Sequence, residues 1–67
     1  MKGKTRITIQ GILDKKWKDS FDAIEIIYKG SNTIFTVEIK DEAHLYGILN
    51  LIRDLNLKLI SVNLAED

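Results

Sequence analysis

The sequence contains no cysteine and no proline among its 67 residues. Without cysteine, neither a disulfide framework nor a thiolate metal site can supplement a hydrophobic core. Without proline or a polar tract, the sequence shows no linker, repeat or second domain. A chain of this size buries only about 60% of the surface that its unfolded form exposes. We therefore expect one small domain, residues 1–67, whose stability comes from apolar packing and is helped by self-association.

An excess of charge and long apolar runs are missing as well. The ten basic and ten acidic side chains cancel, which argues against a dedicated nucleic-acid-binding protein. No apolar run approaches the ~20 residues of a transmembrane helix, and no signal peptide is evident at the start. We therefore expect no membrane association and a cytoplasmic location.

The strongest pattern is a helix followed by a strand, in residues 41–63. At about 100° per residue, one helix face carries five aliphatic side chains: Leu45, Ile48, Leu49, Ile52 and Leu55. The carboxylate of Asp41 can cap the first turn, and Asn56 tolerates the left-handed conformation that ends many helices. Residues 57–64 then become β-rich, but they place apolar residues on both faces, so the buried face of this strand stays open.

Three further strands precede the helix. Residues 5–13 alternate with Ile7 and Ile9 on one side, and Gly11 predicts a bulge or a bent end. Residues 23–29 and 33–40 form a hairpin around the turn Gly30-Ser31-Asn32. The hairpin side chains expected to point inward are Ile24, Ile26, Tyr28, Phe35, Val37 and Ile39.

The segment between the first strand and the hairpin, residues 14–21, is expected to be a short helix. Leu13, Trp17 and Phe21 are four residues apart, which places them on one face of a helix. One or two turns are expected, because so short a helix is marginal without tertiary contacts. Trp17 is predicted to form a lid over the core.

This order of elements predicts an α+β fold. The economical arrangement is a split β-α-β, or ferredoxin-like, two-layer sandwich with four antiparallel strands in the order 4-1-3-2. One long helix and a rudimentary first helix would cover one face of the sheet. The alternative is a ββαβ layout that has the same sheet without a regular first helix.

Residues 41–62 resemble a group of short uncharacterised bacterial proteins. The shared motif is D-[QE]-A-x-L-x-G-[IL]-L-x-x-I-R-D-L-[GN]-L-x-L-[IL]-S-V, with Glu42 where Gln is usual and Asn56 where Gly is usual. The likeness extends more loosely to the Ile-Thr-Ile-x-Gly opening, to Trp17 and Phe21, and to the Tyr-Lys-Gly turn. It implies a small stand-alone bacterial domain and implies no activity.

Residue types that carry chemistry are few and scattered. His44 is the only histidine, and with Asp41 on the same helix face it falls short of the three or four ligands of a zinc site. Neither Ser20 nor Ser61 lies in a G-x-S-x-G elbow, and no glycine-rich phosphate loop is present. We therefore expect no catalytic residues, no metal, no cofactor and no enzymatic activity.

Two features favour association between copies of the chain. Aliphatic residues are expected on the open face of the sheet, where they would form a patch with Thr36: Ile27, Ile34, and either Ile60 with Val62 or Leu59. On the outer helix face, Gly47 costs about 1 kcal/mol relative to alanine, a cost that the close approach of another backbone would explain. We expect a homodimer, through the sheet in preference to the helix.

A basic loop supports a different function. Lys15, Lys16, Trp17 and Lys18 could contact a nucleic-acid backbone or a base. The open faces of the first and third strands, however, carry no aromatic residue for stacking, and Glu38 repels phosphate. The leading hypothesis is a non-enzymatic protein-interaction module that self-associates. The alternative is a small regulatory or nucleic-acid-binding domain that uses the basic loop around Trp17.

Overall fold

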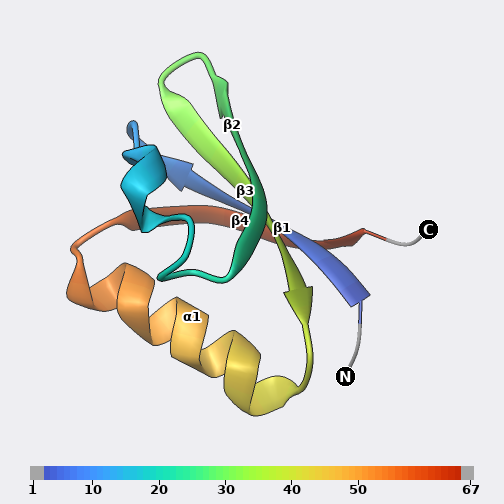
Figure 1. Cartoon of the computed structure of the whole chain (residues 1–67). Helices are drawn as coiled ribbons and strands as arrows, with labels where there is room; N and C mark the ends of the chain where they lie inside the picture. Colours follow the sequence, from blue (N-terminus) through green and yellow to red (C-terminus); the bar gives the residue numbers. More distant parts are fainter. Residues whose placement is uncertain (1–2, 66–67) are drawn as a thin grey trace.

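The computed structural model describes residues 3–65, which form a small α+β fold with one α-helix and a four-stranded antiparallel sheet. The elements are β1 (Gly3–Gln10), the 3-10 turn η1 (Lys15–Trp17), β2 (Ala23–Lys29), β3 (Asn32–Ile39), α1 (Glu42–Asp54) and β4 (Lys58–Ala65). The strand order is β2-β3-β1-β4, which reads 4-1-3-2 from the opposite edge. Figure 1 shows α1 crossing one side of the sheet between the end of β3 and the start of β4.

The predicted strand periodicity is confirmed in β1 and β3. Along β1, Thr5, Ile7 and Ile9 are buried, and they alternate with more exposed polar side chains. Phe35 and Val37 of β3 lie opposite Ile7 and Thr5, on the same buried face. The two central strands therefore supply the floor of the core.

The prediction that Ile24 belongs to the core is wrong. Ala23 lies opposite Val37, and Glu25 lies opposite Thr36, so Ile24 is the extra residue of a β-bulge. The Ile24 side chain is 48% exposed, and Ala23 takes the inward position instead. Sequence alternation cannot reveal this shift, because a bulge changes the face of every residue on one side of it.

Both predicted ends of α1 are confirmed. The Asp41 carboxylate accepts a hydrogen bond of 2.8 Å from the His44 backbone N–H. At the other end Asn56 has a φ of 59°, and the backbone N–H of Leu57 donates to the carbonyl of Ile52 over 3.0 Å. This bond across the final turn is the Schellman motif. Between the caps, Ile48 and Ile52 are buried against the sheet.

The segment between β1 and β2 covers the core without forming a regular helix. Its only helical part is the three-residue η1. Trp17 is half-buried against the core, as predicted. Phe21 is only 1% exposed, and its ring centroid lies 4.9 Å from that of Phe35. Phe21 therefore anchors this segment to the core, as its spacing from Leu13 and Trp17 predicts, although no regular helix forms there.

The buried hydroxyl of Thr33 fixes the start of this segment to the hairpin. It donates to the Gly11 carbonyl over 2.7 Å and accepts from the Leu13 N–H over 2.9 Å. The Tyr28 hydroxyl donates to the Leu13 carbonyl. Gly11 turns the chain out of β1 with a φ of +97°, which confirms the predicted bent end of the strand. The β2 side of the core is therefore closed by hydrogen bonds as well as by apolar packing.

Candidate functional site

The open face of the sheet, opposite α1, carries a smaller apolar area than the sequence predicts. Ile27 lies opposite Ile34, and Ile34 lies opposite Thr8. Thr36 lies between Glu25 and Arg6 in the next row across the sheet. Apart from the two isoleucines, the paired residues of this face are polar or charged: Lys4, Arg6, Thr8, Gln10, Glu25, Lys29, Asn32, Thr36, Glu38, Lys58, Ser61 and Asn63.

The aliphatic residues of β4 form a different surface from the one expected. Val62 lies opposite Ile7, Leu64 opposite Thr5 and Leu59 opposite Ile9. These three partners on β1 are buried on the α1 side. Val62 therefore does not lie on the open face, and the open question of which face of β4 points inward is resolved. Ile60 is the extra residue of a bulge between Leu59 and Ser61.

We call Leu59, Ile60, Val62 and Leu64 the β4 apolar row. Their side chains are 42%, 50%, 38% and 55% exposed, although three of the four lie opposite buried core residues. Gly3 makes room for the last of them, since the Leu64 Cδ1 lies 3.0 Å from the position that a Cβ of Gly3 would occupy. The row is therefore the part of the core side that α1 leaves uncovered.

The α1 side of the sheet is covered unevenly. His44 contacts Asp22, just before β2, at one edge of the sheet. On a helix of 3.6 residues per turn, His44 and Tyr46 point about 160° apart. Tyr46 therefore lies on the flank of α1 turned toward β4, and its side chain is exposed. Trp17, Phe21, Ala23 and Ile26 pack into or against the core on the β2 side, whereas none of residues 58–64 does so.

Gly47 lies on the outer face of α1, as the sequence predicts. It is exposed, and a Cβ built there meets no atom within 4 Å. A second helix could therefore approach at this point. Nothing in the packing of residues 3–65 requires glycine at this position.

The predicted basic loop lies at η1. The Lys15 Nζ is 5.9 Å from the centroid of the Tyr28 ring, and the Lys16 Nζ is 5.9 Å from the Trp17 ring. Lys18 forms the exposed end of the turn. Because Trp17 packs against the core, its indole is only partly available as a platform for stacking a base.

His44 links two elements that the sequence did not connect. Its Nδ1 accepts the Lys40 backbone N–H over 3.2 Å, and its Nε2 lies 3.1 Å from an Asp22 carboxylate oxygen. In the neutral ring, the Lys40 bond places the proton on Nε2, which then donates to Asp22. Asp22 has a φ of 53°. Aspartate is one of the residues that tolerate this conformation, but nothing in the sequence pairs Asp22 with His44.

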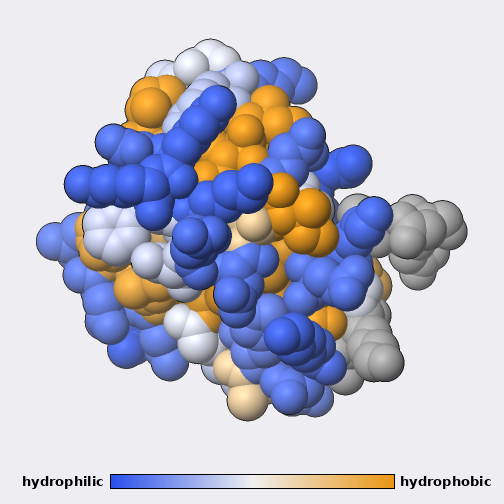
Figure 2. Space-filling view, viewed as in Figure 1, coloured by the Kyte–Doolittle hydropathy of each residue, from blue (hydrophilic) through white to orange (hydrophobic). Residues whose placement is uncertain are grey.

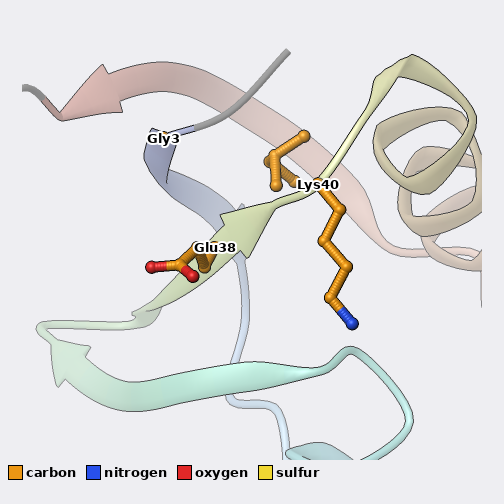
Figure 3. Close-up of a pocket in the computed structure, with 4 residues that line it drawn as sticks. Gly3, Glu38 and Lys40 are labelled. Carbon is orange, nitrogen blue, oxygen red and sulfur yellow. The ribbon is translucent and has the colours of Figure 1, made fainter.

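A hollow of about 330 Å³ opens at the end of the sheet where β1 begins, lined by Gly3, Glu38, Ile39 and Lys40. Figure 3 shows the Glu38 and Lys40 side chains pointing away from each other. The lining therefore holds no pair of functional groups aimed at a common point. Figure 2, viewed as Figure 1, shows several groups of hydrophobic residues at the surface among hydrophilic ones.

In residues 3–65, no group of three or more His, Asp or Glu side chains could hold a metal ion. Over the same residues, no helix has the length and the apolar character needed to cross a membrane.

One comparison with known proteins gives a match. A family model described as a domain of unknown function, DUF8691, matches residues 4–63. The chain belongs to the DUF8691 family. The matched residues of this DUF8691 chain include the basic loop, Gly47 and three members of the β4 apolar row, with Leu64 just beyond the match. No curated protein and no solved structure matches the DUF8691 chain.

Proposed function

We propose that this DUF8691 chain is a small non-enzymatic interaction module that self-associates. The observation that carries the proposal is the β4 apolar row, in which four large aliphatic side chains are half-exposed beside the core. Single exposed aliphatic residues are normal on protein surfaces, but adjacent ones along one strand favour an interaction site.

The place of these side chains in the fold supports the same proposal. Leu59, Val62 and Leu64 lie opposite buried residues of β1, so a wider cover would make them part of the core. The one α-helix of residues 3–65 is too narrow to cover the whole sheet, and a chain this small has few other residues that could cover the β4 apolar row. A second copy would supply the missing cover, as is common for small domains.

Three finer inferences accompany the proposal. The all-antiparallel sheet and the single crossover helix support a ferredoxin-like sandwich in which η1 replaces the first helix. The motif in residues 41–62 supports an origin among small bacterial proteins, with a role in the cytoplasm. The absence of enzymatic activity is supported by His44, whose two ring nitrogens are both engaged, and by the diverging side chains of Glu38 and Lys40.

Light scattering across concentrations from micromolar to millimolar tests the proposal. We expect the mass of the wild type to rise toward that of a dimer. Leu64→Lys places a charge in the β4 apolar row and should keep the chain monomeric, whereas Ile34→Lys, its control on the open face, should still dimerise. A wild type that stays monomeric throughout would contradict self-association. A dimer that only Ile34→Lys abolishes would move the surface to the open face.

A second candidate function uses the basic loop. Lys15, Lys16 and Lys18 are exposed on one turn, and within residues 3–65 no carboxylate lies within ion-pair distance of them. This favours a small nucleic-acid-binding or regulatory domain. Retention on an oligonucleotide column that falls with salt would support it, provided that Lys15→Glu with Lys18→Glu abolishes the retention. Retention that both forms share would exclude the loop.

A further inference from the structure

We infer that the edge of β4 pairs antiparallel with the β4 edge of a second copy, which joins the two sheets into one across a two-fold axis. This inference rests on the proposed self-association and names the partner and the geometry. The pairing would lie in residues 61–65, where β4 is regular after its bulge.

The sheet order makes β4 an edge strand. Its inner neighbour is β1, and among residues 3–65 no strand pairs with its other side. The backbone N–H and C=O groups along that side are therefore available to another strand, which is the situation that promotes edge-to-edge pairing. A strand of eight residues is long enough for such a seam.

The chemistry of the strand offers little to prevent this pairing. The only charged residue of β4 is Lys58, at its start. The other edge strand, β2, carries Glu25 and Lys29 and is interrupted by the bulge at Ile24. Charges and bulges are the features by which natural sheets protect their edges. The β2 edge has both, whereas the regular part of β4 has neither.

The antiparallel orientation follows from charge and from symmetry. A parallel in-register pairing of the whole strand would set the two Lys58 residues opposite each other, whereas the antiparallel seam over residues 61–65 leaves them beyond its two ends. A two-fold axis perpendicular to the sheet also keeps both α1 helices on one face. Centred on Asn63, the seam sets Val62 of one copy opposite Leu64 of the other on that face. The two β4 apolar rows therefore meet on the side of the joined sheet that carries the helices.

The size of the contact sets its expected strength. A standard interface uses about 20–30 residues per side, and the described part of β4 with its row supplies far fewer. We therefore expect a weak dimer with a dissociation constant of about micromolar or above. This range fits the concentrations used for light scattering.

Disulfide trapping tests the geometry of the β4 seam. Because the sequence has no native cysteine, only the introduced thiols can cross-link. Asn63→Cys places a thiol on β4, and Glu25→Cys is its control on β2. Both positions are exposed, lie in the same row across the open face and occupy opposite edges. Under mild oxidation we expect Asn63→Cys to form a covalent dimer about tenfold faster than Glu25→Cys, because pairing raises the local thiol concentration.

The outcomes separate this inference from the proposed function. Faster cross-linking of Asn63→Cys that Leu64→Lys suppresses would support the β4 seam. Equal rates, or faster cross-linking of Glu25→Cys, in a protein that light scattering shows to be dimeric would overturn the seam while self-association stands. A protein that stays monomeric by light scattering, with equal cross-linking rates, would overturn both.

Discussion

The two edges of the sheet differ in how they are finished. On the β2 side, Phe21 fills the core, the Thr33 hydroxyl binds the crossing segment, and His44 contacts Asp22. On the β4 side, the aliphatic side chains that lie opposite β1 stay half-exposed. The core side of the sheet is therefore covered more completely at the β2 edge than at the β4 edge.

From this difference we expect the stability of the monomer and its association to depend on different residues. Substitutions on the β2 side should change the free energy of unfolding of the monomer. Substitutions on the β4 side should change it little and should act on association instead. Four predictions test this division, and urea unfolding followed by circular dichroism measures each of them.

The largest difference is expected between Phe21 and Leu64. Phe21→Ala should cost about 3–5 kcal/mol of unfolding free energy, because the buried ring leaves a cavity against Phe35. That loss approaches the whole stability of many small domains. Leu64→Ala should cost less than about 1 kcal/mol, since the side chain is already half in water. Equal costs for the two variants would contradict the comparison of the edges.

The two threonines of β3 provide the next test. Thr33→Val should cost about 1–3 kcal/mol, because it leaves the Leu13 N–H and the Gly11 carbonyl without their buried partner. Thr36→Val, on the open face of the same strand, should stay within about 0.5 kcal/mol of the wild type. The comparison fails if the open-face variant loses as much stability as the buried one.

Asp22 combines a side-chain contact with a left-handed backbone. Asp22→Ala should cost about 1–2 kcal/mol, since alanine is strained at this φ and cannot accept from His44. Asp22→Gly removes the same contact without the strain and should cost less. If glycine is as damaging as alanine, the contact with His44 and not the backbone conformation dominates.

Gly47 gives the smallest effect and the opposite sign. Gly47→Ala should raise the free energy of unfolding by up to about 1 kcal/mol, because alanine favours the helix and the position is open. Light scattering of this variant should show unchanged dimerisation if the seam lies at β4. Loss of the dimer would instead place the interface on the outer face of α1.

The helix ends and the strand alternation could be predicted from the sequence, because they depend on residues close together in the chain. The cap at Asp41, the left-handed Asn56 and the alternation of β1 depend on neighbours in the chain. Trp17 was predicted as a lid for the same reason, since its spacing from Leu13 and Phe21 is local.

The rest depends on pairing between distant strands. In the structure Ile24 lies outside the core and Val62 lies on the α1 side, because β-bulges shift the register there. A bulge leaves no clear mark in the sequence. The burial of Thr33 follows from its hydrogen bonds to Gly11 and Leu13, in a crossing segment whose path the sequence does not specify. For the same reason Val62 was predicted on the open face, whereas it lies on the α1 side and Ile60 lies at the bulge.

The bulge at Ile60 also makes the length of β4 adjustable. Leu59 lies opposite Ile9 and Ser61 lies opposite Thr8, so Ile60 has no partner of its own on β1. Deleting Ile60 would join Leu59 directly to Ser61 and restore simple alternation, with each remaining residue still opposite its present neighbour. A variant that lacks this one residue should therefore keep the same face of β4 on the α1 side of the sheet.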